Sequence, residues 1–201
     1  MLVVFCGLPC CGKSTLTVKV AESCSSKYFL EPEEDFWPNW IKEGNLDKFS
    51  ALNWFRSTRV PEYKKAALIS EQELVFVDSF YDVLIKYYIS DPSFNWLISK
   101  ENAYYDIIKQ TAELDAKLLA VPDLLIFIKV TEENWSILKK RRNRVYDETV
   151  KLIENYQMQD AIYNAAITYC TDAGANFIEV EQRIDNYKDV VEQITTYLNS
   201  L

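Results

Sequence analysis

The segment from Gly7 to Ser14, with the sequence GLPCCGKS, constrains the fold of this chain more than any other feature. It follows an apolar stretch at residues 2–6 and opens a helical pattern that extends from about Lys13 to about residue 24. The spacing Gly-x4-Gly-Lys-Ser lets backbone N–H groups turn inward around phosphate groups, and the positive end of the following helix faces the same charge. The chain has only four glycines, two of them in this pattern, so an ordinary glycine-containing turn is a poor alternative. The sequence therefore predicts a strand, a phosphate-binding loop and a helix.

This interpretation assigns the triphosphate of ATP to the loop. Lys13 is expected to reach the β and γ phosphates, and the Ser14 hydroxyl to take one coordination place on Mg²⁺. Activation of the two loop cysteines by the helix N-terminus would make them redox-sensitive; the alternative is that the loop simply tolerates small side chains there. The residues expected to contact the nucleotide in this loop are Gly7, Leu8, Pro9, Cys10, Cys11, Gly12, Lys13, Ser14 and Thr15.

Composition narrows the class of protein further. With 201 residues, 49% of them hydrophobic, the chain can bury one sizeable core, so we expect a single domain over residues 1–201. A net charge of −8 argues against a nucleic-acid-binding protein. Because no apolar stretch reaches the roughly 18 residues of a membrane span, we expect no membrane association and interpret the apolar start as a strand, not a signal peptide. Five cysteines without metal-ligand spacing and the lack of histidine favour reduced thiols, a cytoplasmic location and acid–base chemistry by carboxylates.

Apolar runs alternate with helical patterns along the chain. Strands are expected at residues 2–6, 28–30, 74–77, 124–130 and 175–180. Helices are expected at residues 13–24, 46–71, 102–120, 135–144, 149–169 and 187–198, with Pro61 as a kink or break. The inner face of the helix at 102–120 is expected to consist of Ile107, Ile108, Ala112, Leu114, Leu118 and Leu119. Strands too apolar to face water predict a parallel sheet covered on both sides, which is an α/β three-layer fold.

Five further motifs follow the phosphate loop in a characteristic order. They are FLEP at 29–32 with a tryptophan soon after, WFRSTR at 54–59, VDSFY at 77–81, KKRRNR at 139–144, and VEQRID at 180–185. In this order, and over almost the whole chain, these motifs resemble those of the deoxynucleoside kinase family, relatives of the thymidylate kinases. The resemblance implies a P-loop kinase fold with a five-stranded parallel sheet in the order 2-3-1-4-5, and a small lid at about residues 139–148.

The resemblance also implies roles around the reacting groups. Glu31 matches the general base for a sugar 5′-hydroxyl; the alternative is that it is one residue of an exposed acidic run, Glu31 to Asp35. Trp37, which matches a pocket wall, falls one residue later than in the family. Asp78 matches the acidic residue near Mg²⁺. Ser79 stands where the family carries an arginine that supports the base and the transferring phosphate, and serine supplies no such charge.

Acceptor and lid residues follow from the other motifs. Arg56 and Arg59 lie one turn apart on a predicted helix and match substrate-contacting arginines, though an exposed basic face is an equal alternative. Asn53 is the candidate for the family's base-reading glutamine. In the lid, the pair Arg142 and Arg144 matches the clamp on the transferring phosphate, and Asp147 the partner of the sugar 3′-hydroxyl; a solvated basic face or a nucleic-acid patch is the alternative. Arg183 and Ile184 match the loop around adenine, or form a plain connection.

The function that these expectations favour is ATP- and Mg²⁺-dependent phosphorylation of the 5′-hydroxyl of a nucleoside or deoxynucleoside. A thymidylate-type monophosphate kinase is the first alternative, but those kinases usually carry arginine immediately before Glu-Pro, where this chain has Leu30. A nucleotide-binding regulator with little transfer activity is the second, and Ser79 is the evidence for it. The expected partner is a small nucleoside or nucleotide, and the resemblance allows a homodimer through apolar helices.

Overall fold

The computed structural model describes residues 1–43, 47–142 and 155–201. At its centre lies a five-stranded sheet in which every pair of neighbours is parallel, in the order β2-β3-β1-β4-β5. The strands are β1 (Leu2–Gly7), β2 (Lys27–Phe29), β3 (Val75–Asp78), β4 (Leu124–Lys129) and β5 (Asn176–Glu181). Both the parallel sheet and the predicted strand order are confirmed.

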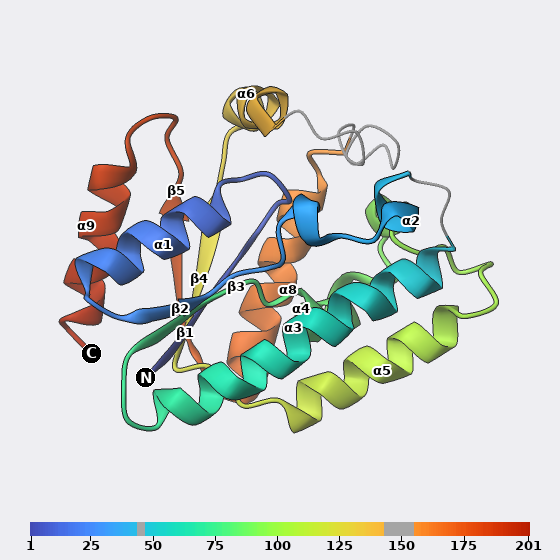
Figure 1. The fold of residues 1–201 in the computed structure, drawn as a ribbon, viewed down its shortest axis with the longest axis horizontal. Coiled ribbons are helices and arrows are strands. Elements are labelled where there is room, and N and C mark those ends of the chain that lie inside the picture. The colour runs from blue at the N-terminus through green and yellow to red at the C-terminus, as the bar shows by residue number, and fades with distance from the viewer. Residues whose placement is uncertain (44–46, 143–154) are drawn as a thin grey trace.

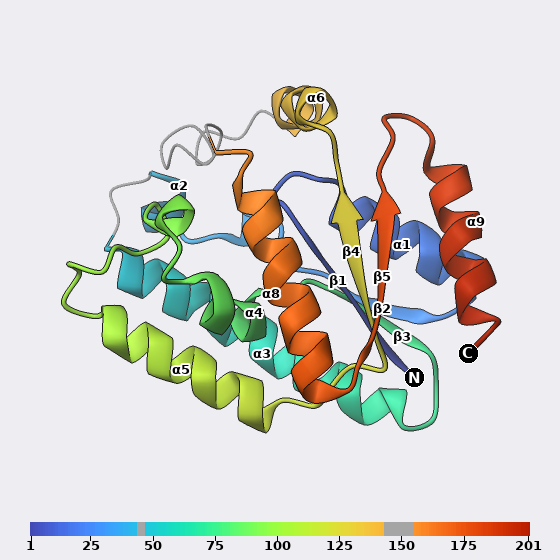
Figure 2. The same cartoon turned by 180° about the vertical axis from the view of Figure 1, so that it is seen from behind.

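Helices cover the two faces of the sheet, as Figures 1 and 2 show from opposite sides. One face carries α1 (Lys13–Ser23) and α9 (Tyr187–Leu198), which pack against each other. The other face carries α3 (Lys48–Ser70), α4 (Tyr81–Tyr88) and α8 (Met158–Ala173), with α5 (Tyr105–Leu118) packed outside α4. The remaining elements of the described residues are α2 (Asn39–Lys42), α6 (Glu132–Arg142) and the 3-10 turns η1 (Glu34–Phe36) and η2 (Pro92–Phe94).

The register of the central strands brings functional residues to one edge. β1 pairs with β3 so that Phe5 lies opposite Asp78, and with β4 so that Gly7 lies opposite Ile128. All residues of β1 and β3 are buried, which explains why both strands are continuously apolar up to their ends. Because parallel strands share a direction, the loop after β1 and the carboxylate at the end of β3 meet at the same edge. No helix in the described part of the chain has the length and apolar character that spanning a membrane would require.

Two details of the helices differ from the sequence-based expectation. α3 continues unbroken through Pro61. In α5 the predicted inner face is only partly correct: Ile108, Ala112 and the following Leu119 are buried, but Ile107, Leu114 and Leu118 are 49%, 55% and 74% exposed. The physical reason is Asp115, which is 4% exposed and pairs with Arg56 of α3. This ion pair turns a polar residue of α5 inward and an apolar stripe outward.

Candidate active site

The loop that follows β1 has the path that its glycine spacing predicts. Gly7 has a φ of +146°, and a Cβ at this position would lie 2.7 Å from the carbonyl oxygen of Ile128, so the close approach to β4 requires glycine. Gly12 has a φ of +89° and immediately precedes α1, which begins at Lys13. The positive end of α1 therefore faces the concave side of the loop, as a phosphate site requires.

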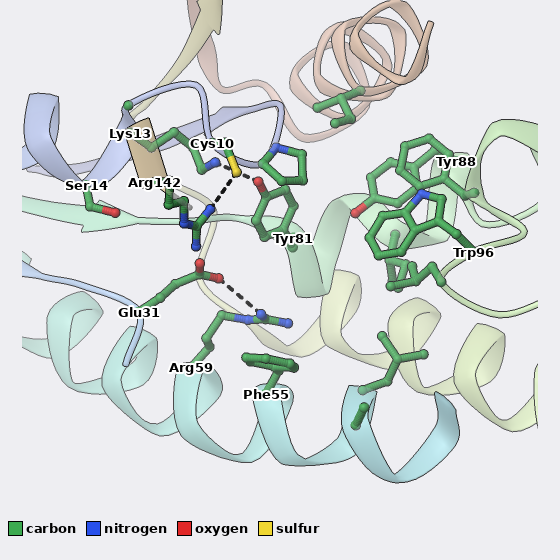
Figure 3. Close-up of a pocket in the computed structure, with 18 of the residues that line it drawn as sticks. Cys10, Lys13, Ser14, Glu31, Phe55, Arg59, Tyr81, Tyr88, Trp96 and Arg142 are labelled. Atoms are coloured by element: carbon green, nitrogen blue, oxygen red, sulfur yellow. Dashed lines mark hydrogen bonds and ion pairs between the residues drawn. The ribbon is translucent and has the colours of Figure 1, made fainter. Parts of the chain in front are cut away.

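Lys13 is buried, and its ammonium group lies against the loop (Figure 3). Nζ donates hydrogen bonds to the Leu8 carbonyl at 2.9 Å and to the Tyr81 hydroxyl at 2.6 Å, and that hydroxyl donates to the Gly7 carbonyl at 2.9 Å. Burial disfavours the charged form, but the surrounding acidic groups, first Tyr81 and Cys11, outweigh it and raise the pKa of Lys13 well above its ordinary value. The loop therefore contains a fixed cation.

Ser14 and Asp78, the two residues expected to hold a metal ion, lie in contact with each other. The Ser14 hydroxyl donates to Asp78 Oδ2 at 2.5 Å, whereas Oδ1 of the same carboxylate is buried without a hydrogen-bond partner among the described residues. Burial raises the pKa of Asp78 to about 6, against the opposing effect of Lys13. A buried carboxylate with an unused oxygen beside a hydroxyl fits Mg²⁺, which binds through one or two protein oxygens plus water and substrate phosphates. In the described part of the chain, no group of three or more histidine, cysteine, aspartate or glutamate residues could hold a metal ion by itself.

The carboxylate of Glu31 is fixed from two sides next to the phosphate loop. Its Oε1 accepts from the Ser79 hydroxyl at 2.9 Å and from Nη1 of Arg59 at 3.1 Å. Arg59 is itself held by a two-point ion pair with Asp82, with Nε–Oδ2 at 2.7 Å and Nη2–Oδ1 at 2.9 Å. Figure 3 shows that Arg59 extends from α3 toward Glu31. Arg59 of α3 thus brings a cation next to Ser79, the position at which the related family carries an arginine and this chain does not.

A cavity of about 370 Å³ extends from the phosphate loop past Glu31 between aromatic walls. One wall is Trp37, whose indole donates to the Pro32 carbonyl at 2.8 Å and whose ring meets Phe55 edge-on at 5.1 Å between ring centres. Another wall contains Tyr88 and Phe94, stacked at 4.1 Å. The volume suits a small ligand, and the aromatic faces suit a flat ring.

Arg142, at the end of α6, lies over the loop. Its Nη1 donates to the Cys10 sulfur at 2.9 Å, and the side chain lines the cavity (Figure 3). Its charge also opposes the rise that burial causes in the pKa of Asp78. The other two lid residues of the sequence prediction, Arg144 and Asp147, lie outside the described residues.

The structure does not bring every predicted residue to the cavity. Asn53 donates to the Phe49 carbonyl at 3.0 Å, and Arg56 pairs with Asp115, so both point elsewhere. Arg183 is exposed, and neither it nor Ile184 lines the cavity.

Tyr81, Asp82 and Lys48 are among the residues at the site that sequence reasoning did not assign. Tyr81 and Asp82 directly follow the VDSF segment, but only the fold reveals their contacts with Lys13 and Arg59. Lys48 begins α3 and lines the cavity. The helical spacing of Lys48 with Ala51, Leu52 and Phe55 is a sequence signal that could have identified it.

No protein-family model matches the sequence, and a search of curated proteins also finds no match. Solved structures, however, are similar over nearly the full chain. A deoxyadenosine kinase from M. mycoides with bound dATP superposes with a TM-score of 0.70 at 18% sequence identity, covering 99% of this chain and 100% of that one.

Two thymidylate kinases are also similar. The enzyme from Candida albicans has a TM-score of 0.63 at 18% identity, covering 99% of this chain and 91% of its own. The enzyme from Ehrlichia chaffeensis has a TM-score of 0.55 at 16% identity, covering 99% and 98%. The chain therefore has the fold of the P-loop kinases. Deoxyadenosine kinase and thymidylate kinase, both found among the similar structures, are the kinds of enzyme that the motifs resemble.

Proposed function

We propose that this protein is a kinase that transfers the γ-phosphate of ATP to the 5′-hydroxyl of a nucleoside or deoxynucleoside. The observation that carries the proposal is the position of Glu31, whose carboxylate lies between the phosphate loop and the aromatic cavity. An alcohol is a poor nucleophile unless a base accepts its proton, and a carboxylate is the available base in a chain without histidine. The M. mycoides deoxyadenosine kinase has been solved with dATP and with dCTP, which supports a nucleoside or nucleotide as the ligand.

Residues around the phosphate loop would stabilise the negative charge of the phosphates. Lys13 would hold the β and γ phosphates, and Arg142 would approach the phosphate in transfer, with Arg144 as its proposed partner in the lid. Ser14 and Asp78 would hold Mg²⁺, which when bound neutralises charge on the phosphate oxygens. Asp147 remains the proposed contact to the sugar 3′-hydroxyl. The five cysteines are free thiols, in keeping with the cytoplasmic location that we propose.

Glu31→Gln tests the proposal directly. The change keeps the shape of the side chain but removes the proton acceptor, so kcat with a nucleoside should fall roughly 10²-fold or more. The acceptor is first identified by measuring ADP production with a panel of nucleosides and monophosphates. Glu33→Gln, an exposed neighbour in the same acidic run, is the matched control and should leave kcat unchanged.

An unchanged kcat for Glu31→Gln with a nucleoside would contradict the role of Glu31 and with it the nucleoside kinase proposal. ADP production with none of the acceptors would favour a nucleotide-binding regulator instead.

The second candidate is a monophosphate kinase, which the structural similarity to two thymidylate kinases favours. An acceptor phosphate is already ionised and needs cations rather than a base. The cation beside Glu31 is Arg59, and it is already paired with Asp82 and Glu31. Because it is not free to hold an acceptor phosphate, this pairing favours a hydroxyl acceptor. With a monophosphate acceptor, Glu31→Gln should have a much smaller effect than with a nucleoside.

Arg142→Ala should lower kcat by about 10³-fold and raise the KM for ATP by much less, because a lid arginine acts mainly on charge that develops during transfer. Arg141→Ala is the matched control: this neighbour forms a pair with Asp185 at 2.8 Å, does not line the cavity, and should leave kcat nearly unchanged. Steady-state kinetics with varied ATP separates the two parameters. An effect on KM alone would assign Arg142 to ground-state binding.

A further inference from the structure

The face of α3 that lines the cavity has a cation at each end. Its consecutive lining residues lie one, three or four positions apart, so they form one stripe of the helix. At the end near the phosphate loop the stripe carries Arg59, which has carboxylate partners. At the other end it carries Lys48, eleven residues earlier and therefore about 16 Å along the helix axis. The stripe consists of Lys48, Ala51, Leu52, Phe55 and Arg59.

Between these two ends the cavity offers few polar groups. Among the described lining residues there is no asparagine or glutamine, and the one carboxylate is Glu31, at the phosphate end. The indole N–H of Trp96 is already engaged with the Met158 sulfur at 2.9 Å. The Tyr88 hydroxyl can donate or accept, so it does not discriminate between ligand groups. Lys48 is thus the one charged group at the far end of the cavity, within the part of the chain that the structure describes.

Lys48 has an unused hydrogen-bonding capacity. The side chain is partly buried, and no hydrogen bond or ion pair joins it to another described residue. Burial lowers the pKa of Lys48, and no carboxylate opposes this effect. An ammonium group offers three donors and no acceptor, and leaving it partly desolvated without a partner is unfavourable. A ligand atom that accepts a hydrogen bond would relieve this cost, whereas an amino group would meet donor with donor.

We infer that Lys48 determines acceptor preference, by donating to a ring carbonyl oxygen on the outer edge of the base. This inference rests on the proposed function, since it takes the acceptor hydroxyl to lie at Glu31 and the base between the aromatic walls. The expected substrates are nucleosides whose base carries an oxo group at the edge that faces Lys48. Bases with an amino group at that position are disfavoured.

Two pairs of nucleosides differ at this edge, where the oxo member also carries a proton on the neighbouring ring nitrogen. Deoxyinosine and deoxyadenosine differ in an oxo or amino group at position 6, and deoxyuridine and deoxycytidine differ in the same way at position 4. For the wild type, kcat/KM should be at least about tenfold higher for the oxo member of each phosphorylated pair, the effect of one hydrogen bond gained against one donor left unpaired. Lys48→Met keeps the length of the side chain without its charge and should bring the ratio close to one.

Lys64→Met is the matched control, because Lys64 lies on the exposed side of the same helix. It should retain the oxo preference of the wild type. Thermal unfolding of both variants checks that the fold is kept, and Lys48→Arg, which keeps donors at this position, should retain the preference if a variant lacking the charge is unstable.

The possible failures are distinguishable. If the wild type phosphorylates no nucleoside, the proposed function fails and this inference fails with it. If it phosphorylates nucleosides without oxo preference, or if Lys48→Met keeps that preference, the proposed function stands and the role of Lys48 is wrong.

Discussion

Lys13→Ala is expected to reduce kcat/KM on the order of 10⁴-fold, because two effects add. A fixed donor aimed at developing charge contributes about 10²- to 10³-fold to the chemical step, and removal of the only lysine in the loop also weakens ATP binding. In the described structure Nζ lies between the Leu8 carbonyl and the Tyr81 hydroxyl, so the ammonium is positioned before any phosphate arrives.

Turnover by ADP production and ATP affinity by titration should be measured together. Lys19→Ala is the matched control, since Lys19 is an exposed lysine on the same helix whose ammonium lies over the Tyr187 ring. It should bind ATP and turn over like the wild type. Normal turnover by Lys13→Ala would mean that the loop does not hold the triphosphate, and the assignment of residues 7–15 would have to be abandoned.

Much of the fold was predictable because local sequence reports directly on burial. The runs at β1, β3 and β4 are apolar throughout since both faces of these strands are covered, and their positions were predicted to within about a residue or two at each end. The path of the phosphate loop was equally predictable, because Gly7 and Gly12 adopt positive φ values that favour glycine. The face of α5 was not, since Asp115 turns inward to meet an arginine 59 residues away.

The two arginines of α3 show why the acceptor side of the site was harder to predict from the sequence. Arg56 and Arg59 lie one turn apart and are indistinguishable by pattern. Their roles depend on carboxylates that the fold brings from elsewhere: Asp115 of α5 engages Arg56, whereas Asp82 of α4 and Glu31 after β2 engage Arg59. Sequence reasoning identified the missing cation at Ser79 and, separately, both arginines as candidate substrate contacts. Only tertiary contacts distinguish one from the other.

The geometry predicts that Arg59 does the work of the cation that Ser79 does not supply. Arg59→Ala should lower kcat on the order of 10⁴-fold, because Glu31 loses a fixed partner and the reacting phosphate loses a nearby charge. The same change leaves Asp82 without its partner, and this carboxylate is 13% exposed in the pair, so the free energy of unfolding should fall by about 3–5 kcal/mol. Activity must therefore be measured on protein shown to be folded by circular dichroism.

Arg56→Ala is the control on the same helix. It loses an ion pair with Asp115 but no contact to the cavity, so it should cost stability while kcat stays within about threefold of wild type. Arg59→Lys keeps the charge but not the planar fork that meets Asp82 at two points, and should be intermediate.

A swap of the cation between two positions gives the sharpest test. Ser79 is 5% exposed, so Ser79→Arg alone should crowd Glu31 and Arg59 and lower activity. In Arg59→Ala the space beside Glu31 is vacated. Adding Ser79→Arg to this variant should raise its kcat at least about tenfold, because the new guanidinium again lies between the base and the transferring phosphate. If Arg59→Ala turns over normally while folded, or if the double variant gains nothing over it, the cation beside Glu31 is not part of the transfer step.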